Sequence, residues 1–360
     1  MVGEGNGQLW ATILFRIVHS RDKLAAMKRA VLILVAVVVF RFSGAAQAAP
    51  DTGFKLSLPE HRGQLSWSAE GFKVIQYSAK SEGREIGIRG RDQSGRLTFL
   101  GFLFLVPEEA PLTSAKCRDG AVESLKKGDP KLKIESAEMA LPDRPSIAMA
   151  RYAAQASGGK SVYSVQGFVA INDMCGDLEV YSDTPITRDD PVVQRIFASY
   201  RLDPNYSPQF DSALLYAQTL YQARMYKAAA PMFEVALLKI KENPDIAARM
   251  MKDTKTATRV VTDQAGMAYG MSGNIQKARS LFEKAIAEDP DYPLNYYNLA
   301  CADAEEKNLA DARTHLQQAF ARKANVTSGE AMPDPTKDDS FLPYRDNKEF
   351  WAFLMSLQPQ

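Results

Sequence analysis

The second half of the chain contains a pattern of small and aromatic residues that returns at a fixed interval. One copy consists of Gly266, Tyr269, Ala278, Phe282, Ala285 and Pro290. The next copy consists of Leu299, Ala300, Ala312, Leu316 and Ala319. The alanines at 278 and 312 lie about 34 residues apart. Such a period predicts stacked helical hairpins, because one hairpin cannot bury its apolar face alone.

An earlier segment repeats the same spacing less regularly. Ala229, Phe233 and Ala236 match the second helix of the pattern but lie about 49 residues before it. Roughly 15 extra residues, within Glu242–Ala257, intervene. We expect them to form an extended second helix or an inserted loop. With this divergent unit, about three hairpins span residues 210–325, which is the minimum for a stable array.

These residues resemble the tetratricopeptide (TPR) family. The resemblance implies that Gly266, Ala278 and Ala285 are small because two helices touch there. It implies that Tyr269 and Phe282 fill the space between the helices, and that Pro290 ends a hairpin.

The TPR resemblance also implies that the first helices line a concave face that binds a protein or peptide. The inner-facing positions are Leu214, Gln218, Tyr221, Asp263, Met267, Gly270, Leu294, Tyr297, Cys301 and Ala304. Methionine and tyrosine there favour an apolar peptide ligand. Leu214 and Leu294 stand where a carboxylate clamp would need cations, so a carboxylate-ended partner is not expected. Alternatively, several of these residues pack against the N-terminal domain or the inserted segment.

Residues 326–360 form a loop followed by an apolar segment. The loop contains Pro333 and Pro335, and the apolar residues after it include Phe341, Phe350 and Trp351. We expect a capping helix that packs on the last hairpin. The alternative is an exposed docking motif.

The region 50–205 alternates apolar and polar residues in short runs, which is typical of strands. Strands are expected at 54–58, 72–77, 85–89, 97–106, 132–137, 147–154, 162–171, 178–182 and 198–202. Helices are expected at 113–127 and from Asp190–Pro191 onward. This order predicts an α+β domain with an antiparallel sheet and two helices. It resembles the Mog1/PsbP-like fold, a resemblance that implies a binding or assembly module and no catalytic residues.

Cys117 and Cys175 both lie in this first domain. A disulfide between them would tie the start of a helix to the turn before the 178–182 strand. The alternative is two buried free thiols, which behave as small apolar side chains.

The N-terminal segment 1–48 contains an export signal. Met27-Lys28-Arg29 precedes an apolar run, Ala30–Phe40, and Ala46 and Ala48 suit cleavage after Ala48. The run is shorter than the about 20 residues of a membrane span. We therefore expect translation to start at Met27 and the mature protein to be periplasmic or secreted. An uncleaved anchor formed by residues 9–40 is the alternative, as in a structural envelope protein.

Charge and motif content narrow the classes of function. A net charge of +1 argues against a nucleic-acid partner. His19, His61 and His315 lie far apart, so neither a metal site nor a cofactor is expected. The sequence therefore predicts an exported, non-catalytic adaptor. The alternative is an envelope enzyme with a site in the first domain, whose candidate residues are His61, Arg89, Arg91, Asp92 and Arg151.

Overall fold

The computed structural model describes residues 53–80, 84–106, 111–139, 147–155 and 161–357. The proposed export signal and the start at Met27 lie outside these residues. Contacts divide the chain into two compact units between Ser207 and Pro208.

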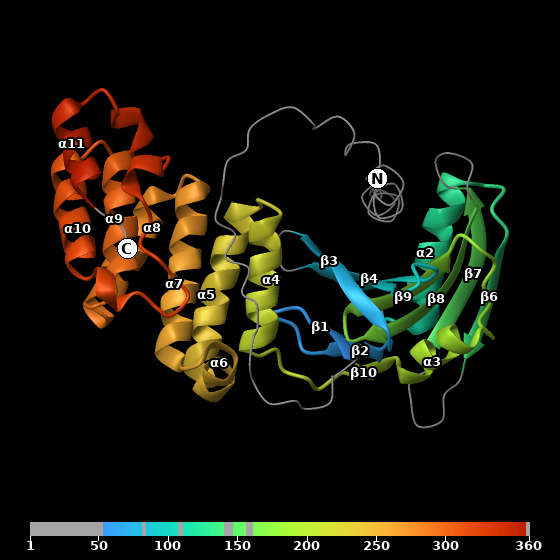
Figure 1. The fold of residues 1–360 in the computed structure, drawn as a ribbon. Helices are drawn as coiled ribbons and strands as arrows, with labels where there is room; N and C mark the ends of the chain where they lie inside the picture. The colour runs from blue at the N-terminus through green and yellow to red at the C-terminus, as the bar shows by residue number, and fades with distance from the viewer. Residues whose placement is uncertain (1–52, 81–83, 107–110, 140–146, 156–160, 358–360) are drawn as a thin grey trace, which may run out of the picture. The chain divides into compact units, whose positions relative to one another are not determined.

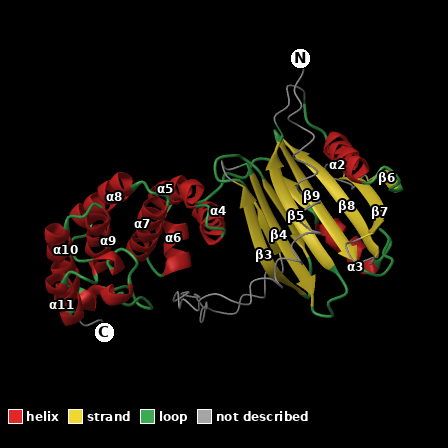
Figure 2. Cartoon of the chain, turned by 90° about the horizontal axis from the view of Figure 1, so that it is seen from above, coloured by secondary structure: helices red, strands yellow, loops and turns green. Residues whose placement is uncertain are grey.

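The first unit is built on a seven-stranded antiparallel sheet with the order β3-β4-β5-β9-β8-β7-β6. Figure 2 shows this sheet face on. Its strands are β3 (Phe72–Lys80), β4 (Glu85–Asp92), β5 (Thr98–Leu105), β6 (Ile134–Met139), β7 (Ile147–Gln155), β8 (Ser161–Ile171) and β9 (Met174–Ser182). A two-residue turn with Asn172 at φ 51° joins β8 to β9, so β9 begins at Met174. Cys175 therefore lies within a strand, where a turn was expected.

One face of this sheet is covered by a small sheet and by helix α3 (Pro191–Ser199). The small sheet has the order β1-β2-β10 and consists of β1 (Gly53–Leu56), β2 (Gln64–Ser68) and β10 (Arg201–Asp203). Trp67 packs edge-on against Phe99, with ring centroids 5.5 Å apart. A Cβ at Gly101 would lie 2.3 Å from the Trp67 ring, so only glycine permits this close contact.

The opposite face carries helix α2 (Ser114–Gly128), which packs on β7, β8 and β9. Figure 1 shows α2 and α3 on opposite sides of the sheet. Thr113 caps α2 by accepting a hydrogen bond from the Lys116 N–H. Cys117 forms a disulfide with Cys175, with their Cα atoms 5.8 Å apart. The predicted α+β class and the disulfide are confirmed, and β2 is an element that the prediction missed.

The second unit is a run of helices. They are α4 (Phe210–Gln222), α5 (Tyr226–Glu242), α6 (Pro244–Met251), α7 (Thr254–Met271), α8 (Ile275–Glu288), α9 (Pro293–Glu305), α10 (Leu309–Ala321) and α11 (Lys348–Ser356). The pairs α4/α5, α7/α8 and α9/α10 form three hairpins. The extra residues before the second hairpin form a separate helix, α6, and not an extended helix or a loop.

The three hairpin turns share one backbone conformation. Arg224, Gly273 and Lys307 each have a φ between 59° and 82° at equivalent positions. Directly after two of these residues, Asn274 and Asn308 cap the second helices through their side chains. The repeat that is visible in the sequence is thus also a repeat of local geometry.

Packing within the second hairpin follows the small and large pattern of the sequence. A Cβ at Gly266 would lie 2.1 Å from Cζ of Phe282, so the two helices touch at the glycine. Ala278, Phe282 and Leu299 form a buried cluster, and Tyr269 packs against it. The equivalent residues of the other hairpins are also buried, namely Ala229, Phe233, Ala236, Ala300, Ala312, Leu316 and Ala319. Ala285 is half-buried, and Pro290 lies exposed, after α8 has ended.

Candidate functional site

The first helices of the hairpins, α4, α7 and α9, are linked by polar contacts. The Gln218 side-chain amide donates to Oε1 of Gln264 at 3.4 Å, which joins α4 to α7. The Asn298 side-chain amide donates to Oδ1 of Asp263, which joins α7 to α9. Gln264 and Asn298 occupy equivalent positions in successive repeats. Gln218 and Asp263, predicted to face a ligand, therefore also hold neighbouring helices together.

The exposed large apolar side chains of these three helices lie on α7. Met267 is 40% exposed and Met271 is 53% exposed. The Tyr221 hydroxyl on α4 donates to Sδ of Met271 at 3.4 Å. A Cβ at Gly270 would meet no atom within 4 Å. We call Tyr221, Met267 and Met271 the methionine patch, an apolar surface beside open space.

Asp263 is the charged residue among the predicted inner-facing positions. Burial, together with the smaller effect of the nearby Glu330 charge, raises the pKa of its carboxyl to about 7. The hydrogen bond from Asn298 acts in the opposite direction. This carboxyl therefore titrates near neutral pH, and the charge of the α7–α9 face changes with pH.

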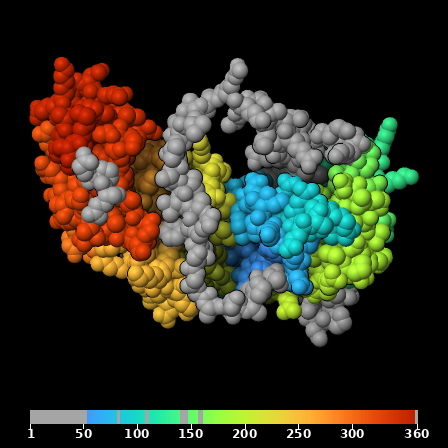
Figure 3. All heavy atoms as spheres, in the orientation of Figure 1, coloured from blue at the N-terminus to red at the C-terminus, as the bar shows by residue number. Residues whose placement is uncertain are grey.

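The inner-facing positions of the third hairpin are covered by the chain itself. Leu294 and Tyr297 are 9% and 1% exposed, and they belong to a core that includes Met332, Phe341 and Phe350. In Figure 3 the red atoms of this C-terminal segment lie directly against the orange hairpins before it.

The C-terminal segment takes the place that a further first helix would have. The Tyr297 hydroxyl donates to Oδ2 of Asp338 at 3.1 Å, and Tyr297 occupies the position equivalent to Asp263. The Tyr344 hydroxyl donates to the Ala304 carbonyl at 2.5 Å. Leu214, the corresponding position on α4, is also buried, at 4% exposure. Of the predicted binding residues, Met267 is thus exposed, and Gln218, Tyr221 and Asp263 are half-buried.

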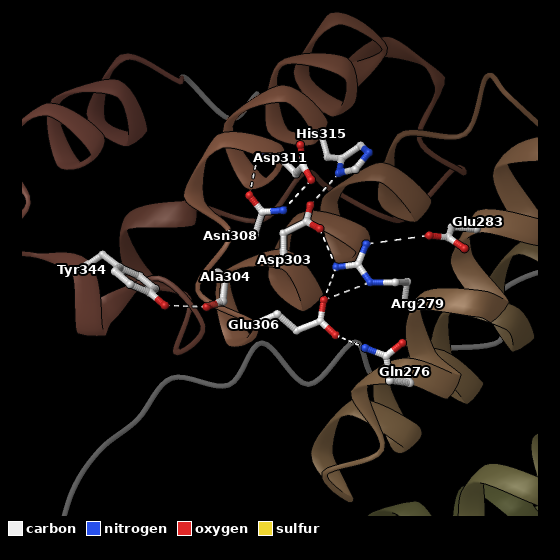
Figure 4. A network of polar contacts seen from close by, with 10 residues as sticks. All are labelled: Gln276, Arg279, Glu283, Asp303, Ala304, Glu306, Asn308, Asp311, His315 and Tyr344. Atoms are coloured by element: carbon white, nitrogen blue, oxygen red, sulfur yellow. Dashed lines mark hydrogen bonds and ion pairs between the residues drawn. The ribbon is translucent and has the colours of Figure 1, made fainter.

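A buried carboxylate joins the second and third hairpins. Asp303 is fully buried, and its Oδ1 lies 2.6 Å from the Arg279 guanidinium of α8. Its Oδ2 lies 2.6 Å from Nδ1 of His315 on α10. Figure 4 shows Asp303 between these two partners, with Glu306 also holding Arg279. Because Arg279, Asp303 and His315 lie on α8, α9 and α10, the network holds three helices together.

The residues singled out for a possible enzyme site have separate local partners. His61 lies 3.7 Å from Asp173, and Arg151 pairs with Glu135 at 2.8 Å. Arg91 donates to the Gly95 carbonyl within its own turn. Asp92 accepts the Leu97 N–H in that same turn. Among the described residues, no group of three or more histidine, cysteine and acidic side chains is placed to hold a metal ion.

A second polar cluster lies on the α2 face of the large sheet. Of its members the sequence indicated only Arg89, as a candidate residue of an enzyme site. We call it the sheet polar cluster; its members are Arg89, Tyr152, Ser164, Gln166, Asp177, Glu179 and Tyr181. Glu179 accepts hydrogen bonds from the Tyr152 hydroxyl at 2.9 Å and the Ser164 hydroxyl at 2.5 Å. Arg89 donates to the Tyr181 hydroxyl at 2.9 Å. The available signal was the pair of acids at alternate positions of an otherwise apolar strand.

Comparison with known proteins bears on the second unit. Residues 271–328 match the family model described as Tetratricopeptide repeat. A search of curated proteins found no match. No helix in the described part of the chain is long and apolar enough to cross a membrane.

Two solved structures resemble part of the chain. PcrH from Pseudomonas aeruginosa is 14% identical, with 41% of this chain and 90% of that chain covered and a TM-score of 0.28. The Sgt2 TPR domain from Aspergillus fumigatus is 16% identical, with 40% and 81% covered and a TM-score of 0.28. TM-scores this low do not establish a shared arrangement. Neither structure is described as Mog1/PsbP-like, and that resemblance of the first unit stays a prediction. The family match and the hairpin geometry together identify the C-terminal unit as a tetratricopeptide repeat region.

Proposed function

We propose that this protein is an exported, non-catalytic adaptor that binds a protein or peptide partner through the first-helix face of its repeats. The repeats support a role in protein–protein interaction. The observation that carries the binding mode is the methionine patch on α4 and α7. Met267 and Met271 lie one helical turn apart, so their side chains extend from one face of α7.

The chemistry of the patch favours an apolar peptide segment. Methionine is flexible and polarisable, so two exposed methionines can adapt to the shape of a partner side chain. Tyr221 adds a ring that can anchor such a contact. The open space beside Gly270 leaves room for a partner to approach α7 closely.

The same face disfavours a partner that is held by its terminal carboxylate. Leu214 is buried and provides no cation, and Asp263 would repel a second carboxylate when ionised. The third hairpin adds no free surface because Tyr297 lies beneath the C-terminal segment. The proposed binding surface is therefore confined to the first two hairpins.

Export is supported by the sequence and is consistent with the disulfide. The basic start, the apolar run and the small residues before Ala49 are typical of a cleaved signal. A disulfide such as Cys117–Cys175 persists in oxidising compartments. We propose a periplasmic or secreted location, with membrane anchoring by residues 9–40 as the alternative. N-terminal sequencing of the exported protein distinguishes the two, since an anchored form retains those residues.

We also propose that the protein performs no chemistry on its partner. The support is that His61 and Arg151 each lie beside a nearby acid, whereas Arg91 and Asp92 hold one turn together. The Asp303–His315 pair has its own structural role between three helices.

Affinity capture from the envelope fraction tests the binding mode. Met267→Glu places a charge on the methionine patch, and Leu238→Glu is the matched control. Leu238 is 54% exposed on α5, a second helix, so its substitution also replaces an exposed apolar residue.

We expect Leu238→Glu to retain the captured partner and Met267→Glu to lose it, with both variants folded by circular dichroism. A partner captured equally by both variants would show that this face is not the binding surface. Turnover of a small molecule by the purified protein would contradict the non-catalytic assignment.

A further inference from the structure

The sheet polar cluster contains two buried oxygen acceptors without a donor. Oδ1 of Asp177 and Oε1 of Gln166 are buried, and neither has a hydrogen-bond partner among the residues that the structure describes. The two residues are 9% and 7% exposed. A buried polar atom without a partner destabilises the fold, by about 1–3 kcal/mol in mutational data. Such a cost is typical of a site that a ligand completes.

Of the two acids on this strand, only Asp177 has a buried oxygen without a donor among the described residues. Glu179 lies two residues further on the same face of β9 and has donors from Tyr152 and Ser164. Gln166 is paired with Glu179 across the ladder between β8 and β9, and it also hydrogen-bonds to Glu179. Glu179 is therefore satisfied within the protein, and Asp177 is the acid that retains a free oxygen.

The surroundings of Asp177 favour a positive group. In the sheet register, Asp177 lies between Phe102 of β5 and Phe168 of β8, and all three side chains are on the α2 face. Aromatic rings beside a carboxylate attract cations through their electron-rich faces. Phe168 is fully buried, whereas Phe102 is half-buried. Helix α2 packs on β7, β8 and β9. Among the described residues, this helix therefore covers the Phe168 side of Asp177.

We propose that Asp177 and Gln166 bind the ammonium group of a small organic amine on the α2 face of the large sheet. The ammonium group offers three N–H donors, which can satisfy Oδ1 of Asp177 and Oε1 of Gln166 together. The rings of Phe102 and Phe168 flank the charge. Nε of Arg89, also buried and without a partner, suits an oxygen acceptor elsewhere on the same ligand.

Binding of this ligand releases a proton. Burial, and then the charge of Glu179, hold the pKa of the Asp177 carboxyl well above its usual range, which favours its protonated form in the free site. An incoming ammonium stabilises the ionised carboxylate, and the carboxyl proton leaves to solvent. Glu179 is the charged group that acts on Asp177, and Arg89 lies on the same face of the sheet. Burial, and then the charge of a neighbouring acid, raise the pKa of the Tyr152 and Tyr200 hydroxyls and keep both protonated.

Calorimetry on the full chain tests the site with n-butylammonium chloride as the probe. The controls are 1-butanol, which has the same chain without charge, and sodium chloride at equal ionic strength. We expect saturable binding of n-butylammonium in about the millimolar range and none of 1-butanol. Titrations in phosphate and in Tris at pH 7 are expected to differ in heat by the buffer ionisation of the released proton.

Asp177→Asn removes the charge at nearly constant shape, and Asp183→Asn alters an exposed acid just after β9 as the matched control. We expect Asp177→Asn to weaken n-butylammonium binding about tenfold or more and to abolish the proton release. Asp183→Asn should bind as the unaltered protein does. Equal binding of n-butylammonium and 1-butanol by the unaltered protein, or no saturable binding, overturns the proposal without reference to any variant.

Discussion

At the scale of single residues, this chain uses the smallest side chains where helices meet and the most polar where they must be held. Gly266 has no side chain, and the Phe282 ring occupies the space where a Cβ would lie. Asp303 binds Arg279 and His315 from two other helices. Only the glycine can be recognised from the sequence. The glycine belongs to the repeating pattern, whereas the role of Asp303 depends on partners that only the folded chain brings together.

Two glycines of α7 give opposite predictions for the same substitution. Gly266→Ala would place a methyl group against the Phe282 ring and should destabilise the repeat unit by about 1–3 kcal/mol. Gly270→Ala meets no atom and should stabilise the helix by about 0.5–1 kcal/mol, because alanine has the higher helix propensity. Calorimetric melting of both variants measures the difference. Equal shifts would mean that α7 and α8 are further apart than described.

Asp263 makes the second unit sensitive to pH. Its pKa is raised from 3.8 to about 7 in the folded protein, so the unfolded chain loses the proton first as pH rises. The folded state is therefore destabilised progressively between about pH 4 and pH 7, by up to about 4 kcal/mol in total. Asp263→Asn should remove this dependence and protect α7 and α9 at pH 8. Amide hydrogen exchange of α7 and α9 at pH 5 and pH 8 measures this change in stability, once the exchange rates are corrected for the intrinsic rate at each pH. A dependence that persists in the variant would contradict the assignment to Asp263.

At the scale of elements, periodicity predicted most helices and strands, and contacts distant in sequence account for the rest. Strand β2 was missed because it has only two buried apolar residues, Leu65 and Trp67, within a turn-rich stretch. Helix α6 lies outside the repeat period, so the pattern contained no information on it. The contact of Tyr297 with Asp338 joins residues that no local pattern relates. The sheet polar cluster depends on strand register, which alternation alone does not fix.

The disulfide joins α2 to β9 and was one of two alternatives at the level of sequence. Cys301 is the remaining cysteine of the described residues and is free. A free-thiol assay on the unfolded, unreduced protein should give one thiol per chain. Reduction should lower the stability of the first unit by roughly 3–4 kcal/mol for a loop of this length. Three reactive thiols in the unreduced protein would contradict the bond.

The C-terminal segment acts as the end of the array. Phe341 is fully buried against Tyr297 and Phe350. Phe341→Ala should destabilise the second unit by about 3–5 kcal/mol through the cavity that it leaves. Leu342→Ala is the matched control, since Leu342 is 40% exposed and its truncation should have little effect. Thermal unfolding of the two variants distinguishes a packed cap from an exposed docking motif. Equal melting temperatures would favour the docking motif.

At the scale of the whole molecule, two separate units share one chain. The first is an α+β unit with a disulfide, and the second is a repeat array closed at its end by the chain itself. We propose the first two hairpins as the surface for a partner, because the inner-facing positions of α9 are covered. The sequence predicted the array and a cap on its last hairpin, but not that the cap would cover the inner-facing positions of α9.

Site-specific photo-crosslinking in intact cells tests the proposed binding surface most directly. A photoreactive amino acid replaces Met271 in the methionine patch or Leu238 on the outer side of the array. The account predicts a discrete crosslinked partner from position 271 and none from position 238. The same crosslinks from both positions, or a partner from position 238 alone, would contradict it.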